Sequence, residues 1–278
     1  MFVDEYRKSL KSPEAEELFD LIFFRPVAYL FVKGVYRFPI TPNQVTMLSL
    51  LAGLLGAYFF SEATPQALVW GALCYAGANV LDCADGQLAR LQQSGTLLGR
   101  VWDGMADYVS TAAVFLGIGV ATNSWLLVII AGLSTAIHAI VFDYYQSEFM
   151  SMGNGSGNFL PNEIRRFTGE IHRRKKERGD GMEVFLLQTY VWYLRVQQRF
   201  GSRRSAETQN YHDARSRIIR PWSFLGPTTN RTLLIVCAIL DELHSYLWGV
   251  AVAGNLWLIV CIALQRRAVE RTETGISR

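Results

Sequence analysis

The sequence has few of the residues that build cysteine-based sites. Among its 278 residues there are only 4 cysteines, and no two of them have the spacing of a metal-binding pair. All lie in apolar stretches, where we interpret them as small core residues: Cys74, Cys83, Cys237 and Cys261. The first twenty residues lack an apolar h-region, so a cleavable signal peptide is not expected. There is no internal repeat, which excludes a repeat architecture.

Charge is scarce over long segments of the chain. Hydrophobic residues make up 50% of the sequence and the mean hydropathy is +0.16, a composition typical of membrane proteins. Four stretches approach the ~20 residues that cross a bilayer, and two more follow; their ranges are 46–61, 67–88, 101–121, 125–146, 231–247 and 247–265. The last pair is interrupted by Asp241, Glu242 and His244, either as a tight polar turn or within one longer helix.

Lysine and arginine are absent from three of the connections between these stretches. They are 62–66, 122–124 and about 241–246. Because basic residues concentrate in short cytoplasmic loops, these connections are expected on the outer side, and all 27 basic residues then fall at or near the cytoplasmic side. The sequence therefore predicts an all-α integral membrane protein with six transmembrane helices and with both termini in the cytoplasm.

Four segments organise the predicted chain. Residues 1–40 form an N-terminal cytoplasmic and interfacial segment, 41–149 a core of helices one to four, 150–229 a cytoplasmic insertion, and 230–278 the last two helices and a tail. Within the first segment, 18–38 mixes apolar and aromatic residues with Arg25, Lys33 and Arg37. This composition favours a helix lying in the membrane interface, which Pro26 would break or kink.

The insertion between helices four and five is strongly basic. It opens with a glycine-rich run at 153–157 that predicts flexibility, and a basic cluster follows: Arg165, Arg166, Arg173, Arg174, Lys175, Lys176 and Arg178. The cluster indicates either a surface resting on anionic lipid or a phosphate-binding site, and nucleic acid is not needed to explain it. The apolar piece 184–196 is too short to span a bilayer, and we interpret it as an interfacial or docking helix.

Four carboxylates interrupt two adjacent spans. Asp82 and Asp85 lie three residues apart at the cytoplasmic end of the second span, and Asp103 and Asp107 lie four apart at the start of the third. Spacings of three and four place each pair on one helix face. Since the two helices are antiparallel and joined by a short connection, the pairs are expected to converge. Charged residues inside spans are costly and therefore indicate a functional site.

The acids need a counter-charge, and the only basic residues near them in sequence are Arg90 and Arg100. Divalent cations would supply it, and an all-oxygen ligand set favours Mg²⁺ or Mn²⁺. Two ions about 4 Å apart are the usual arrangement for phosphoryl displacement. The sequence thus predicts a site for two metal ions.

Small residues accompany the acids. Gly86 follows Asp85, Ala89 lies one turn further on, and Gly99 lies one turn before Asp103. They remove bulk beside the acids and would admit a nucleotide to the helix backbone, although small residues also serve close helix packing in membranes.

The segment DCADGQLARLQQSGTLLGRVWDGMAD at 82–107 resembles the signature of the CDP-alcohol phosphotransferases. That signature reads D-x-x-D-G-x-x-A-R, about eight residues, then G-x-x-x-D-x-x-x-D. Every fixed position is filled, namely by Asp82, Asp85, Gly86, Ala89, Arg90, Gly99, Asp103 and Asp107. The segment TPNQVT at 41–46 is similar to the start of the family's first span. The resemblance covers about 40–145 and does not account for the insertion.

The resemblance implies roles for these residues. Asp82, Asp85 and Asp103 would hold the two metals, with Asp107 as metal ligand, general base or both. Gly86, Ala89 and Gly99 would make room for the cytidine nucleotide, and Arg90, Asn43 and Thr46 are further candidates to contact it. The expected reaction is attack of an alcohol on a CDP-activated donor with release of CMP. The family also implies a homodimer. The one-sided distribution of basic residues places the active site toward the cytoplasm and predicts membrane lipids as partners.

The substrates stay open. The family transfers phosphatidyl from CDP-diacylglycerol to an alcohol, phosphocholine or phosphoethanolamine from a soluble CDP-alcohol to diacylglycerol, or phosphoinositol to inositol phosphate. The basic insertion slightly favours the first reaction with an anionic acceptor. His138, Asp143 and Glu148, in or just after the fourth span, are weaker candidates for acceptor contacts; Asp143 could instead be a boundary residue, and His138 a packing residue.

Two other classes of membrane protein also use acidic residues with a divalent cation. An aspartate-rich prenyltransferase would have more spans and two distant acidic loops. A divalent-cation transporter would have acids spread through the membrane midplane with paths to both sides. Neither pattern matches four acids that lie within 82–107 toward one end of their spans.

Overall fold

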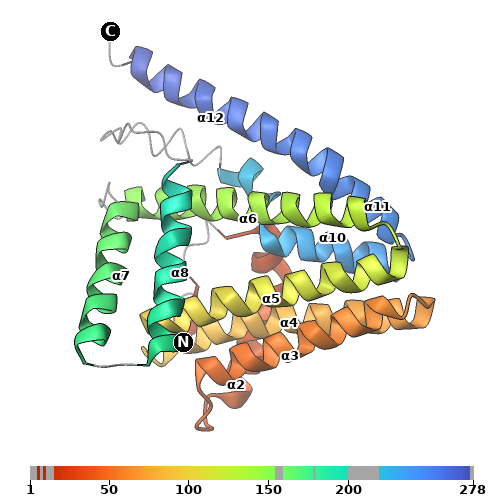
Figure 1. Ribbon diagram of the computed structural model, residues 1–278, viewed down its shortest axis with the longest axis horizontal. Coiled ribbons are helices and arrows are strands. Elements are labelled where there is room, and N and C mark those ends of the chain that lie inside the picture. The colour runs from red at the N-terminus through yellow and green to blue at the C-terminus, as the bar shows by residue number, and fades with distance from the viewer. Residues whose placement is uncertain are drawn as a thin grey trace.

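The computed structural model describes residues 5–6, 9–10, 16–153, 159–177, 180–199 and 219–275. These residues are helical with short connections and include no strand (Figure 1). The predicted all-α class is confirmed.

Four long helices follow one another in the first half of the chain. They are α3 (Pro42–Ser61), α4 (Pro65–Leu91), α5 (Leu97–Thr122) and α6 (Trp125–Gly153). After the insertion come α10 (Pro227–Ile239), α11 (Leu243–Trp248), the π-helix η2 (Gly249–Gly254) and α12 (Asn255–Gly275). Five helical segments of the described chain are long and apolar enough to cross a membrane: α3, α4, α5, Trp125–Met150 of α6, and the continuous run Leu243–Arg267. The protein is therefore a multi-pass membrane protein.

The predicted boundary between the last two spans is wrong. It was placed at residue 247, whereas α10 ends at Ile239 and α11 begins at Leu243. Between them Asp241 adopts a left-handed φ of 60°. The alternative of a polar turn is therefore confirmed for Asp241 and Glu242, whereas His244 lies in α11. The apolar run continues from 243 to 265, which is why hydropathy alone placed the boundary between the two spans too late. With 13 residues, α10 is about 20 Å long, so the six-span count stays a prediction.

Threonines set the starts of α3, α4 and α5. Thr41 caps α3 in a capping box with Gln44, in which each side chain accepts a hydrogen bond from the other residue's backbone N–H. Thr64 and Thr96 cap α4 and α5 in the same extended backbone conformation. Such caps satisfy amides that the first helical turn leaves unbonded. The start of the first span at 41–46 is thereby confirmed.

Glycines bring three of these helices into backbone contact. A methyl group added at Gly117 of α5 would overlap the carbonyl oxygen of Ala57 on α3. One added at Gly56 of α3 would lie 3.2 Å from the carbonyl oxygen of Gly71 on α4. Small residues allow this approach, as is common among membrane helices. Helices α3, α4 and α5 form the most closely packed part of the bundle.

The turns that lack basic residues lie at one end of the bundle (Figure 1). There the Ser124 hydroxyl lies 3.2 Å from Nε2 of His244, which joins the α5–α6 turn to α11. The α4–α5 connection and the insertion lie at the opposite end (Figure 1).

The N-terminal segment packs along α4 at this second end. It consists of the π-helix η1 (Asp20–Phe24) followed by α2 (Arg25–Val35). Pro26 does not break the helix, contrary to the prediction of an interruption there. Instead, the residues before it wind as a π-helix, in which the N–H of Arg25 donates to the carbonyl of Asp20. Whether the segment lies in a membrane interface stays a prediction.

Within the insertion, α7 (Phe159–Lys176) and α8 (Gly181–Gln198) form a helical hairpin. Its apolar core includes Phe167, Leu187 and Leu194 and continues onto Val101 of α5. The apolar piece 184–196 is thus a helix that packs on the bundle, as the docking interpretation expected. Residues 154–157 of the glycine-rich run, for which the sequence predicts flexibility, and Arg178 lie outside the described residues.

Candidate metal and phosphotransfer site

Three of the predicted acids come together. Oxygen atoms of Asp82 and Asp85 on α4 and of Asp103 on α5 all lie within 4.8 Å of one another. Asp85 is buried and the other two are half-buried. The antiparallel helices thus bring the acidic faces together, as their spacing predicted.

Asp107 stands beside this trio and faces Arg231 of α10. The Arg231 guanidinium lies 2.6 Å from Oδ1 of Asp107 through Nη2 and 3.3 Å from Oδ2 of Asp82 through Nη1. The same Nη1 donates to Oδ1 of Asn79 at 2.8 Å, and the guanidinium carbon lies 5.9 Å from the ring centre of Tyr75. Arg231 is therefore a buried cation fixed on several sides, and it connects two of the four acids.

Sequence reasoning missed Arg231. It is the first residue of the predicted fifth span and was counted only among the basic residues at or near the cytoplasmic side. The available signal was an arginine in the TTNR segment directly before an apolar run. Its pairing with Asp107 is a contact between residues far apart in sequence, which spacing within α4 and α5 could not reveal.

Two residues of α3 adjoin the acids. The hydroxyl of Thr46 donates to Oδ2 of Asp85 at 2.5 Å, so Thr46 orients this carboxylate. A methyl group added at Gly99 would lie 3.3 Å from Oδ1 of Asn43. Asn43 and Gly99, both predicted to be near the nucleotide, thus lie next to each other at the same end of the bundle.

Arg90 is engaged by the N-terminal segment. Its Nε donates to the carbonyl of Ser9 at 2.5 Å, and a methyl group added at Gly86 would lie 3.4 Å from its Nη1. Gly86 and Ala89 are half-buried on the same helix. Arg100, by contrast, points to the insertion and pairs with Glu163 at 3.1 Å.

The N-terminal segment also contacts α4 beside the acids. Oδ1 of Asp20 accepts from the thiol of Cys83 at 3.5 Å, and the amide of Gln87 donates to the carbonyl of Arg25 at 3.1 Å. Arg25 in turn pairs with Glu16 at 2.9 Å. Residues 16–25 therefore form one wall next to Asp82 and Asp85.

Glu17 links this wall to the helix that carries Arg231. Its carboxylate accepts from the backbone N–H groups of Thr228 and Thr229 at 3.1 and 2.7 Å, and from the Thr229 hydroxyl at 2.8 Å. A methyl group at Gly226 would overlap this carboxylate. Burial and then the Asp20 carboxylate raise the pKa of Glu17 to about 8, while the hydrogen bonds to the two threonines oppose the rise. Glu17 thus caps the start of α10.

The predicted acceptor candidates differ in their surroundings. Oδ2 of Asp143 accepts from the Tyr193 hydroxyl at 2.9 Å and from the Gln197 amide at 2.7 Å, so α8 reaches the acid directly. Burial, followed by the Asp143 charge, raises the pKa of Tyr193 well above its usual range, which keeps the phenol protonated. His138 is buried, lies 3.2 Å from Oδ1 of Asn255 and packs against Gly254, as a packing residue would. Glu148 is half-buried further along α6.

The acid trio fits a hard divalent cation. All its ligand atoms are carboxylate oxygens, and the group contains neither thiolate nor imidazole. Such donors suit Mg²⁺ or Mn²⁺ rather than zinc. The described cysteines are free thiols and none belongs to this group.

The fold and the site define a multi-pass helical membrane protein with an oxygen-only acidic cluster at one end of its bundle. Comparison with known families makes this more specific, because residues 39–153 match the CDP-alcohol phosphatidyltransferase family. The resemblance noted from the acidic signature is thereby confirmed for this domain.

Curated relatives support the same assignment. The phosphatidylinositol phosphate synthase of Mycobacterium tuberculosis is 29% identical over 137 residues, which cover 46% of this chain and 60% of the relative. The proteins of the same name from Mycolicibacterium smegmatis and Corynebacterium glutamicum are 35% and 32% identical over 94 residues, covering 34% of this chain and 40% of each relative. The matched part thus spans about 40 to 60% of the length of these relatives.

Proposed function

We propose that the protein transfers a phosphatidyl group from CDP-diacylglycerol to an acceptor alcohol and releases CMP. The observation that carries this proposal is the convergence of Asp82, Asp85 and Asp103 within a segment that fills every fixed position of the family signature. The class of enzyme is a transferase of substituted phosphate groups, in agreement with the matched family.

The acids of this chain would share the work. Asp82, Asp85 and Asp103, with Asp107, would hold two Mg²⁺ or Mn²⁺ ions, which supply the positive charge that a pyrophosphate needs on approach and departure. Thr46 fixes the Asp85 carboxylate for this purpose. Gly86, Ala89 and Gly99 leave room for the cytidine nucleotide, and Asn43, Thr46 and Arg90 would contact it.

Asp107 would accept the proton of the acceptor hydroxyl. The acceptor oxygen then forms a bond to the β-phosphorus of the donor. The bond from that phosphorus to the bridging oxygen breaks, and this oxygen leaves with CMP. Arg231 holds Asp107 by its 2.6 Å contact and keeps its carboxylate oriented toward the acids of α4.

The acceptor is proposed to be a phosphorylated polyol. The relatives named phosphatidylinositol phosphate synthase suggest an inositol phosphate, and the basic hairpin α7–α8 provides a cationic environment for an anionic acceptor. Transfer of phosphocholine or phosphoethanolamine to diacylglycerol is the second family reaction to be tested. The site would face the cytoplasm, since the three turns without basic residues lie at the other end of the bundle. We further propose six spans and, from the family, a homodimer.

Purified protein in detergent tests this proposal with labelled CDP-diacylglycerol, Mg²⁺ or Mn²⁺ and a panel of alcohols. CMP release that requires both the ion and inositol phosphate is the expected result. Release only with another alcohol would overturn the acceptor, and release only from CDP-choline or CDP-ethanolamine would overturn the donor. If no pair released CMP while proteoliposomes took up Mn²⁺, the protein would be a cation transporter.

A further inference from the structure

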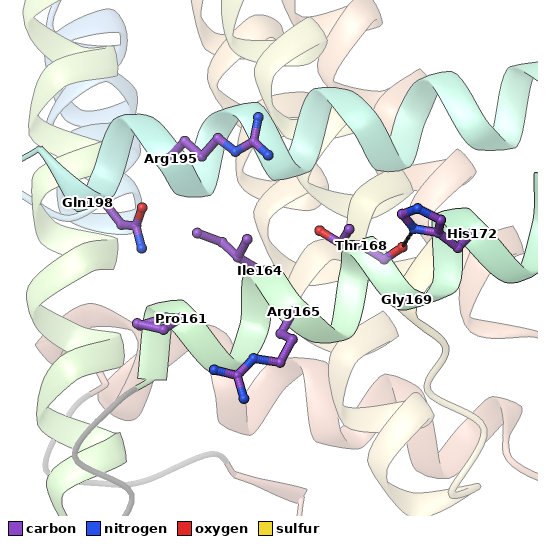
Figure 2. Close-up of a pocket in the computed structure, with 8 residues that line it drawn as sticks. All are labelled: Pro161, Ile164, Arg165, Thr168, Gly169, His172, Arg195 and Gln198. Carbon is purple, nitrogen blue, oxygen red and sulfur yellow. Dashed lines mark hydrogen bonds between the residues drawn. The ribbon is translucent and has the colours of Figure 1, made fainter.

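A groove separate from the acidic cluster runs between α7 and α8 of the insertion (Figure 2). Its volume is about 570 Å³. The lining residues are Pro161, Ile164, Arg165, Thr168, Gly169 and His172 of α7, and Arg195 and Gln198 of α8. This groove is larger than a single water site and lies open at the surface of the hairpin.

The described residues that line the groove carry positive charge and no negative charge. Among them there is no aspartate or glutamate, and neither Arg165 nor Arg195 makes an ion pair with another described residue. The two carboxylates of α7 are engaged elsewhere: Glu163 pairs with Arg100 and Arg166, and Glu170 pairs with Arg173 and Arg174. Arginines that lack carboxylate partners beside a concave surface favour an anionic ligand.

Apolar residues lie in the groove and are exposed elsewhere on α8. Ile164 and Pro161 line its α7 side, and Phe185 and Trp192 of α8 are 59% and 65% exposed. On α8, Trp192 precedes Arg195 by three residues and therefore lies on a neighbouring part of the same helix face. Exposed tryptophan beside arginine is typical of the boundary between headgroups and acyl chains.

Contacts with the bundle place the hairpin at this boundary. The ring centres of Tyr193 on α8 and Tyr108 on α5 lie 6.4 Å apart, and Tyr108 directly follows Asp107. Glu163 of α7 meets Arg100 in the first turn of α5. The hairpin thus sits beside the ends of the spans, where phospholipid headgroups would surround it.

We infer that this groove binds the headgroup of an anionic phospholipid. The Arg165 and Arg195 guanidiniums would bond the phosphate oxygens, Thr168 and Gln198 would bond further headgroup oxygens, and the acyl chains would pass along Phe185 and Trp192. The two guanidiniums point in different directions in Figure 2, so they converge on a phosphate by side-chain rotation, which their exposure permits. The inference does not depend on the reaction at the acidic cluster.

Native mass spectrometry of the purified full-length protein tests the inference with added phosphatidylglycerol or phosphatidylcholine. The variant R165Q/R195Q removes both arginines that line the groove, and R166Q/R173Q is a matched control that removes two arginines paired on α7. We expect the first variant to lose affinity for phosphatidylglycerol by roughly 20-fold, as two membrane-facing arginines would contribute, while the control keeps most of it. Both should leave phosphatidylcholine binding unchanged.

Three results would overturn the inference. They are an equal loss in the two variants, retention of phosphatidylglycerol by R165Q/R195Q, and equal binding of the two lipids by the wild-type protein. A competition experiment on the wild-type protein distinguishes a soluble phosphate ligand from a phospholipid, and it needs no variant. If inorganic phosphate or inositol phosphate displaced phosphatidylglycerol at millimolar concentration, the ligand would be a soluble phosphate ester and the lipid assignment would be wrong.

Discussion

Arg231 lies 2.6 Å from Asp107, so the proposed general base has a fixed cation as its neighbour. Replacing Arg231 by glutamine removes this cation from a buried acidic cluster. We expect turnover to fall by about 100-fold because Asp107 loses its orientation, and divalent ions to bind several-fold more tightly because the cluster gains net negative charge. Enzyme assays and a Mn²⁺ titration measure the two effects. Arg100→Gln is the control, since it removes an exposed arginine from the same end of the bundle.

Asp107 and Asp82 should respond differently to neutralisation. Asp107→Asn is expected to lower turnover by at least about 1000-fold and to leave binding of the CDP donor measurable, because the lost function is proton transfer. Asp82→Asn should weaken binding of both ion and nucleotide. Isothermal titration with the CDP donor, alongside turnover, separates the two variants. Near-normal turnover of Asp107→Asn would show that another group is the base.

Divalent ions should stabilise the folded protein. At about 100 times its dissociation constant, an ion that binds only the folded state adds about 2.7 kcal/mol. Mn²⁺ is therefore expected to raise the melting temperature, and EDTA to reverse the rise. Asp85→Asn and Asp103→Asn should abolish the effect, whereas Asp143→Asn should retain it. If Mn²⁺ still raised the melting temperature of both Asp85→Asn and Asp103→Asn, the metal site would be contradicted.

The raised pKa of Glu17 predicts that the stability of the folded protein depends on pH. Because its pKa in the folded protein is raised from 4.5 to about 8, the folded state keeps a proton that the unfolded state has lost. This contribution is fully present below about pH 4.5 and is lost as the pH rises to 8. Between pH 6 and 8 the free energy of unfolding of the wild type should therefore fall by about 1 to 3 kcal/mol relative to that of Glu17→Gln.

Melting curves of both proteins from pH 6 to 9 measure this difference, which should level off above pH 8. Three charged groups near Glu17 are shared by the two proteins and largely cancel in the comparison: Glu16, Asp20 and Arg25. A difference that stays constant from pH 6 to 8 would assign the titration to another group.

Tyr193 gives a test of the acceptor side. Tyr193→Phe removes the hydroxyl that donates to Asp143 at 2.9 Å. If Asp143 contacts the acceptor, the Michaelis constant for the acceptor should rise several-fold, since one neutral hydrogen bond is worth about 1 kcal/mol. The Michaelis constant for the CDP donor should stay the same. Tyr190→Phe on the same helix is the matched control. Equal changes in both variants would mean that α8 acts only through packing.

The sequence predicted the first four long helices and the convergence of Asp82, Asp85 and Asp103 because both depend on local patterns. The spacing of Asp82 and Asp85 fixes a helix face, and Thr41 and Pro42 mark a helix start. The contacts of Arg231 and Glu17 could not be predicted in this way. They join α10 to residues more than 100 and 200 positions away in sequence, and no periodicity records such pairs. The turn at Asp241 was one of two predicted alternatives, and the local pattern could not decide between them because apolar residues lie on both sides.

The glycine contacts of α3 with α4 and α5 have a mechanical consequence. Backbones that touch cannot slide or rotate past one another without losing van der Waals contact along their whole interface. The helices that carry Asp82, Asp85, Asp103 and Asp107 thus behave as one stiff frame. Any movement that admits a substrate or releases a product falls to the elements around this frame, which are the N-terminal wall, the α7–α8 hairpin and α10.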